Sequence, residues 1–204
     1  MRVGDQVVIS QHPLEAPVEH FETIGFWIEM DSIFKAELKR HRYHHMGSLH
    51  AIEHAMKALF PLLALSSRTD VGGICYPLHP QLQRGAIFVY DYHPGGIGLA
   101  EKGYAVLDRL LDMTRDLVEG CDCEAGCPSC IHFPTCGAGN VPLDKAGSIH
   151  LLHILSGRAR ISRIANGPSH DDEVRAGAKC VLHINGPLLV VRARSGIGTN
   201  AWND

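Results

Sequence analysis

Five cysteines between residues 121 and 136 form the densest group of potential metal ligands in the sequence, with the spacing C-x-C-x3-C-x2-C-x5-C. Structural Zn²⁺ sites use four ligands in a tetrahedron, and a thiolate sulfur lies about 2.3 Å from the ion. Cys127 and Cys130 can form one knuckle, with Gly126 easing the turn. Cys121 and Cys123 can supply the opposite edge. The spacing therefore predicts a structural zinc site.

Other chemistries fit parts of the same segment. A soft, all-sulfur ligand set also suits an iron–sulfur cluster. A redox-active Cys-Pro-x-Cys pair, or cysteines that only fill a core, would leave the neighbouring thiols unexplained. Cys75 and Cys180 stand apart from the cluster, and we expect Cys75 to pack as a small apolar residue in the core.

The segment His50-Ala-Ile-Glu53-His54 has the order of the inverted zinc-hydrolase motif. On a helix these side chains and Lys57 fall on the side away from the apolar stripe, which suits a metal site and equally suits a polar face. A catalytic zinc needs a third protein ligand, and no downstream carboxylate stands in a suitable motif. We favour a polar stripe that faces solvent or a partner, and keep a zinc-dependent hydrolase as the alternative function.

The most basic stretch of the chain contains Lys39, Arg40 and Arg42. These side chains are candidates for contacts with the phosphates of single-stranded DNA, although runs of charge are usually just solvated. The formal net charge of −3 and the pI of about 6.5 exclude wrapping of DNA by a globally basic surface. Any nucleic-acid contact is therefore expected to be local and weak.

A glycine-rich segment runs from Asp91 to Gly98. Backbone amides at such a helix entry can hold an anion. The segment has no Gly-Lys-Ser/Thr continuation, so it is not a nucleoside-triphosphate loop. We favour tight packing between a strand and the helix that follows it.

Periodicity and turn residues place these motifs on alternating strands and helices. Asp144 is expected to cap the last helix, and Pro61 to kink or end the first. The predicted fold class is α/β, with a mixed sheet, two main helices and a cysteine-rich zinc-binding lobe. The expected strands cover residues 3–9, 21–30, 71–76 and 86–90, and the expected helices run from Gly47-Ser48 to about Leu63, from 99 to about 120, and from 145 to about 155.

The composition is that of an ordinary globular protein, with 45% hydrophobic and 20% charged residues among 204. We expect a domain over residues 1–155 and a poorly specified tail over 156–204. Two strand-like runs flank Asn185-Gly186-Pro187, so the tail is either a loose hairpin or an unstructured appendage. No targeting segment or membrane span is recognisable, and the expected location is cytoplasmic.

Several motifs occur along the chain, and as an ordered set they resemble the C-terminal zinc-binding domain of MrfA-like (YprA-type) superfamily 2 DNA helicases. The resemblance runs from about residue 21 to 155. Its motifs are Phe21-Glu22-Thr23 with Trp27, Leu49 to Ala55, Gly72-Gly73, Tyr90-Asp91, Pro94 to Glu101, the cysteine cluster and Pro142 to Lys145.

The resemblance implies that Cys121, Cys123, Cys127 and Cys130 bind Zn²⁺, and that Cys136 is a recurrent fifth cysteine outside the ligand set. It implies no catalytic role for the histidine segment. The sequence contains neither Gly-x-x-x-x-Gly-Lys-Ser/Thr nor Asp-Glu-x-His, so helicase activity does not carry over. The expected function is a non-enzymatic accessory module that works with helicase motor domains or other repair proteins. A remnant without present activity is a third hypothesis.

Overall fold

Strands and helices follow one another along the chain, which confirms the predicted mixed α/β class. The structure, a computed structural model, describes residues 20–157, 162–163, 174–185 and 188–193, with side chains from residue 21 to 156. The elements are β1 (His20–Met30), α1 (Ser32–Arg40), α2 (His45–Leu63), β2 (Val71–Tyr76), β3 (Gly85–Asp91), α3 (Leu99–Ala105), α4 (Leu107–Glu119), α5 (Lys145–Gly157), β4 (Ser162–Arg163), β5 (Val174–Asn185) and β6 (Leu188–Ala193).

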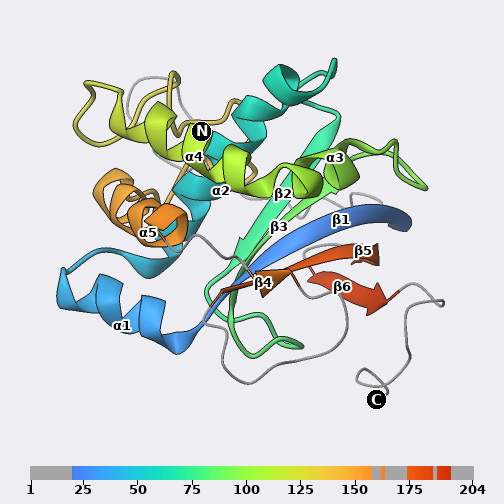
Figure 1. The fold of residues 1–204 in the computed structure, drawn as a ribbon, viewed down its shortest axis with the longest axis horizontal. Helices are drawn as coiled ribbons and strands as arrows, with labels where there is room; N and C mark the ends of the chain where they lie inside the picture. Colours follow the sequence, from blue (N-terminus) through green and yellow to red (C-terminus); the bar gives the residue numbers. More distant parts are fainter. Residues whose placement is uncertain (1–19, 158–161, 164–173, 186–187, 194–204) are drawn as a thin grey trace, which may run out of the picture.

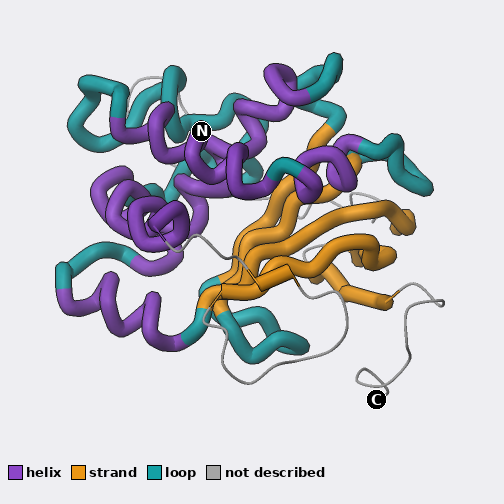
Figure 2. The backbone as a smooth tube through the Cα atoms, in the orientation of Figure 1, coloured by secondary structure: helices purple, strands orange, loops and turns teal. Residues whose placement is uncertain are grey.

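The strands form one sheet in the order β2-β3-β1-β5-β4, with β6 paired to β5 (Figure 1). The neighbouring strands are antiparallel except β4 and β5, which run parallel, so the sheet is mixed. Figure 2 shows the helices gathered on one side of the strands. Helix α2 packs against β2 and β3, and α3 packs against β1.

Alternation along β1 decides which side chains meet the helices. Phe26, Ile28 and Met30 point to the same face and are fully buried in the main core with residues of α2 and α4. Trp27 points to the other face, where its ring stacks on Phe88 of β3 with 6.2 Å between ring centroids. Strand β3 is buried along its whole length, so it forms the centre of the described core.

Helix α2 carries the apolar stripe that its sequence predicts. Leu49, Ile52 and Met56 are fully buried against the sheet and the neighbouring helices. The helix ends at Leu63, two residues after Pro61, and the amide of Ala64 still bonds the carbonyl of Phe60. None of the helices in the described part of the chain combines the length and hydrophobicity that crossing a membrane demands.

Two expected features of the helices differ from the structure. The helix expected from residue 99 to 120 is two helices, because the backbone at Val106 leaves helical geometry with φ −116° and ψ 27°. Helix α1 was not predicted from the sequence, and it buries only Phe34 and Leu38. The expected strand over residues 3–9 lies outside the described residues.

The C-terminal segment contributes strands to the same sheet. Strand β5 pairs with β1 from His20↔Asn185 to Met30↔Val174, and β6 returns antiparallel along β5. Of the two expectations for the tail, the structure therefore has the hairpin.

Candidate metal centre

Four thiols converge in the loop that joins α4 to α5. The Sγ–Sγ distances are 3.6 Å for Cys121–Cys123, 3.5 Å for Cys121–Cys127, 3.4 Å for Cys123–Cys130 and 3.8 Å for Cys127–Cys130. Four sulfurs at about 2.3 Å from a central ion in a tetrahedron would lie about 3.8 Å apart. The four thiols thus already have nearly the spacing that Zn²⁺ requires, and a soft all-sulfur set suits this ion.

Backbone hydrogen bonds to Cys127 shape the turn that carries Cys127 and Cys130. The Cys127 carbonyl accepts hydrogen bonds from the amides of Cys130, Ile131 and His132, which closes a tight turn. The Cys127 amide in turn points at the Cys130 sulfur, at 3.4 Å. Gly126 precedes the turn with φ +118°, a conformation that L side chains rarely adopt. The sequence Gly-Cys-Pro-Ser-Cys therefore sets the position of two of the four sulfurs.

Local electrostatics favours a thiolate at one of these positions. A hydrogen bond from the Ser129 backbone lowers the pKa of the Cys127 thiol below its ordinary value. Burial raises the pKa of the Cys130 thiol. Zinc binding requires the thiolate forms, so it must displace protons from the cluster.

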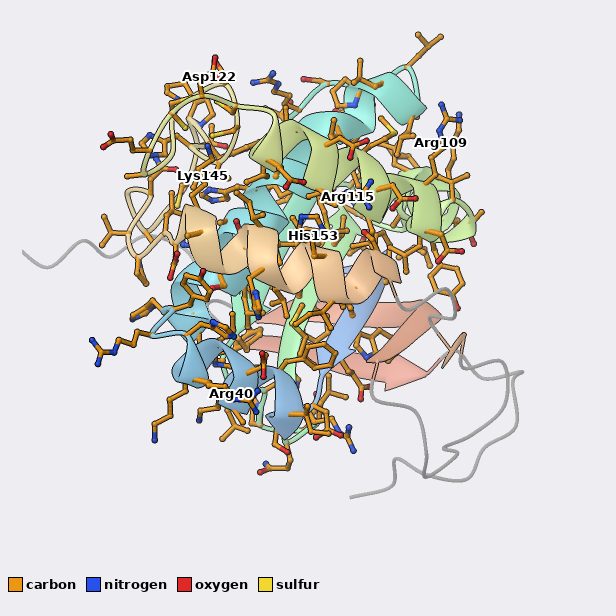
Figure 3. All side chains as sticks on the ribbon, turned by 60° about the vertical axis from the view of Figure 1, so that its left-hand side comes forward. Arg40, Arg109, Arg115, Asp122, Lys145 and His153 are labelled. Atoms are coloured by element: carbon orange, nitrogen blue, oxygen red, sulfur yellow. The ribbon has the colours of Figure 1, made fainter. Side chains whose placement is uncertain are left out.

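Lys145 supports the loop from the first residue of α5. Its Nζ donates hydrogen bonds to the carbonyl oxygens of Cys121 and Cys123, and the side chain is buried. Figure 3 shows Lys145 beneath the loop that carries Asp122. Four thiolates around Zn²⁺ leave a net charge of −2, and the buried ammonium group lies next to it. Sequence reasoning assigned Lys145 no role, although it belongs to the Pro142 to Lys145 motif.

The prediction that the histidine segment of α2 faces solvent or a partner is wrong. His50, Glu53 and His54 are only 5%, 3% and 2% exposed. The loop after Cys130 folds over this side of the helix. His54 Nδ1 bonds the Ile131 carbonyl at 2.8 Å, and His50 Nδ1 bonds the Pro142 carbonyl at 2.9 Å. Side chains buried in this way present no open face to a substrate, which disfavours the hydrolase alternative.

Burial also sets the charges in this region. It lowers the pKa of His54 to about 4 and raises the pKa of Glu53. His54 is therefore neutral at pH 7. Glu53 has Lys57 Nζ at 3.2 Å from its Oε1 and His54 Nε2 at 3.6 Å from its Oε2.

The fifth cysteine lies against this histidine pair. The Cys136 sulfur is 3.4 Å from His50 Nε2, and it also accepts a hydrogen bond from the Asn140 amide. The group of thiols that share one centre contains the other four cysteines of the segment and not Cys136. Cys75 is buried in the main core, as expected from its sequence context, and the side chain of Cys180 lies outside the described residues.

Comparison with known proteins identifies the cysteine lobe. A family model described as the MrfA Zn-binding domain matches residues 52–131. An uncharacterized protein of Methanocaldococcus jannaschii, MJ1572.1, is 34% identical over 110 residues, which cover 52% of this chain and 98% of that protein. The chain belongs to the MrfA zinc-binding domain family. Zn²⁺ is the metal that this family name and the four close cysteines both indicate.

Other relatives of this MrfA-type domain are helicases. The ATP-dependent helicase hrq1 of Schizosaccharomyces pombe is 28% identical over 183 residues, covering 82% of this chain and 17% of the helicase. The helicase YprA of Bacillus subtilis is 28% identical over 127 residues, covering 60% of this chain and 16% of YprA. This chain therefore corresponds to about a sixth of each helicase.

One solved structure is similar in fold as well as in sequence. It is the crystal structure of the DUF1998 helicase MrfA bound to DNA and AMPPNP, with a TM-score of 0.50 and 26% identity. The match covers 71% of this chain and 17% of that helicase. The MrfA-type domain is thus a zinc-binding part of larger helicases, which are enzymes as whole proteins.

The remaining polar motif of the MrfA-type domain is satisfied internally. The glycine-rich segment before α3 was a candidate anion site. Its backbone amides do bind an anionic group, but that group is the carboxylate of Asp91 in the same segment. Asp91 accepts hydrogen bonds from the amides of Ile97, Gly98 and Ala100. The favoured interpretation, tight packing of a strand against the next helix, is confirmed.

The basic stretch lies at the end of α1, away from the cysteine loop. Lys39, Arg40 and Arg42 are exposed, and Arg40 is paired with Glu37 at 3.0 Å. In Figure 3 Arg40 and Asp122 of the cysteine loop lie at opposite ends of the molecule. The structure does not bring the basic residues together with the metal cluster.

Proposed function

We propose that Cys121, Cys123, Cys127 and Cys130 bind one structural Zn²⁺, and that the domain acts as a non-enzymatic accessory part of a DNA helicase or repair system. The observation that carries the proposal is the set of Sγ–Sγ distances, 3.4 to 3.8 Å, at the end of the segment that matches the MrfA family. The relatives named above are helicases of which this domain is a small part.

The zinc ion has a clear structural task in this proposal. The chain between α4 and α5 contains no regular helix or strand, and its own backbone hydrogen bonds close only local turns. The same loop covers the polar side of α2 through the Ile131 and Pro142 carbonyls. By fixing the first half of the loop, the ion would keep this cover in place and give the helicase a rigid surface for docking or strand guidance.

The domain needs a motor from elsewhere for any ATP-driven work. The sequence has no phosphate-binding loop and no Asp-Glu-x-His segment, which hold nucleotide and Mg²⁺ in such motors. Purified protein should therefore show no ATP turnover, with or without DNA. Steady DNA-stimulated hydrolysis that copurifies with the chain would contradict this part of the proposal.

Contact with single-stranded DNA is proposed for Lys39, Arg40 and Arg42. Three phosphate contacts predict a slope of about −2 when the logarithm of the association constant is plotted against the logarithm of salt concentration. Fluorescence anisotropy with a labelled oligonucleotide measures this slope. Arg42→Glu should weaken binding, and Lys102→Glu on the exposed face of α3 is the matched control. Tight binding that persists at high salt, or equal loss in both variants, would contradict the assignment.

The zinc assignment is tested by metal analysis of the purified chain. Cys127→Ser should remove the ion bound by the four thiols and much of the stability, because the binding energy of structural zinc is on the order of 10 kcal/mol. Cys75→Ser is the control, since this buried cysteine is not a member of the four-thiol group. If Cys127→Ser keeps its full zinc content and stability, the four-cysteine assignment is wrong.

A further inference from the structure

A second group of metal-binding atoms lies between α2 and the loop that follows Cys130. One ligand atom each of His50, His54 and Cys136 lies within 4.8 Å of the other two. His50 Nε2 and Cys136 Sγ are 3.4 Å apart. A zinc ion with a Zn–N distance of about 2.0 Å and a Zn–S distance of about 2.3 Å would hold such a pair about 3.5 Å apart in a tetrahedron. His50 and Cys136 therefore already have the spacing of two ligands on one ion, and His54 lies close enough to join them.

The backbone orients both imidazoles for this purpose. His50 Nδ1 contacts the carbonyl of Pro142 and His54 Nδ1 contacts the carbonyl of Ile131. A carbonyl oxygen can only accept, so each Nδ1 must carry the hydrogen, and the lone pair of each neutral ring lies on Nε2. A histidine that ligates a metal through one nitrogen commonly donates its other N–H to a backbone carbonyl or a carboxylate. Both histidines have this arrangement.

The surroundings suit a positive ion. Glu53 lies one residue before His54, and its Oε2 is 3.6 Å from His54 Nε2. With the lone pair of His54 on Nε2, two electron-rich atoms face each other in a buried place, and a cation would relieve this contact. The balancing positive charge, Lys57, reaches the other carboxylate oxygen, Oε1, at 3.2 Å. Oε1 is fully buried, and the ammonium group of Lys57 is its charged partner.

We propose that His50, His54 and Cys136 form a second metal site, which binds a borderline-soft divalent ion such as Zn²⁺. The site shares no ligand with the four-cysteine cluster, so it stands or falls independently of the function proposed above. Two of its ligands, His50 and His54, lie on α2. The third, Cys136, lies in the loop, 82 residues after His54 in the sequence. The ion would therefore link the part of the loop around Cys136 to α2. The first ion would cross-link the part of the loop from Cys121 to Cys130.

Cobalt substitution and metal analysis of the full chain test the site. We expect two metal ions per chain in protein purified without chelators, and two phases in a Co²⁺ titration. One phase should have the strong charge-transfer absorption of four thiolates, and the other should have the weaker absorption of a single thiolate with nitrogen ligands. Both phases together support the second site. A single equivalent that carries only the four-thiolate spectrum would overturn it, and this wild-type result needs no variant to fold.

Variants then assign the ligands. His50→Gln and Cys136→Ala should each lose one ion and keep the four-thiolate spectrum, which also shows that the fold survives. His153→Gln is the matched control, because His153 lies outside the group and pairs with Glu119, and it should keep both ions. Retention of both ions by His50→Gln and Cys136→Ala would overturn the ligand assignment. Cys127→Ser should lose only the four-thiolate phase. The remaining phase would show that the second site binds its ion independently of the first.

Discussion

Asp91 Oδ1 accepts a hydrogen bond from the backbone amide of Ala100 at 2.7 Å, so the last residue of β3 caps the start of α3. The other oxygen of the same carboxylate accepts from the amides of Ile97 and Gly98. Asp91 is fully buried. A strand end and a helix start are thereby joined by three hydrogen bonds to one side chain, close to the sheet face on which α2 also packs.

Asp91→Ala should destabilise the domain strongly. The buried amide of Ala100 and the partly buried amides of Ile97 and Gly98 would lose their acceptor, and an unsatisfied buried group costs about 1–3 kcal/mol. We expect a loss of about 2 kcal/mol or more in the free energy of unfolding, measured by chemical denaturation. Asp112→Ala removes an exposed carboxylate that pairs with Arg115 and should change stability by less than about 1 kcal/mol. A similar small effect for both variants would show that the cap is not needed.

Lys145→Met should weaken zinc binding without removing a ligand. The variant keeps an apolar side chain of similar length, but it loses the hydrogen bonds to the Cys121 and Cys123 carbonyls and the positive charge beside the thiolates. Groups that orient metal ligands typically contribute about 10- to 100-fold in affinity. Competition with a calibrated chelator measures this change. Lys102→Met on α3 is the control, and equal affinities for the two variants would rule out the role of Lys145.

The parts of the fold that were predicted from sequence depend on short-range patterns. Leu49, Ile52 and Met56 recur at helical spacing, and the four clustered cysteines lie within one short segment, so neither feature needs knowledge of distant contacts. Helix α1 was missed because it buries only Phe34 and Leu38, a pair too short to establish a period.

The burial of the histidine segment could not be predicted in the same way. Its polar side was interpreted as a surface because a helix face opposite the core is usually solvated. In the structure an irregular loop covers that face, and the contacts of His50 and His54 reach carbonyls 92 and 77 residues away. Such a loop has no periodicity, so nothing in the sequence of α2 indicates what lies over it.

Stability should fall in alkaline solution, and Tyr90 should account for part of the fall. Burial raises the pKa of Tyr90 from 10.0 to about 12 in the folded state. Between these values the unfolded chain loses the phenol proton first, so it binds fewer protons and unfolding becomes easier by at most about 1.4 kcal/mol per pH unit. Tyr90→Phe should reduce the slope of stability against pH above pH 10. Tyr92→Phe, at a half-exposed ring nearby, is the control, and an unchanged slope in Tyr90→Phe would contradict the prediction.

Removal of residues 158–204 should leave the zinc bound but expose the sheet. The main core, the cysteine loop and all of α5 lie before this cut. The deletion would, however, remove β5, whose pairing covers one edge of β1 along nearly its whole length. An uncovered strand edge of this kind is prone to pair with other chains. We therefore expect a truncated protein that keeps the four-thiolate Co²⁺ spectrum but forms oligomers in light scattering as its concentration rises. Loss of the metal-binding fold on truncation would show that β5 belongs to the cooperative core, and the domain boundary expected at residue 155 would then be wrong.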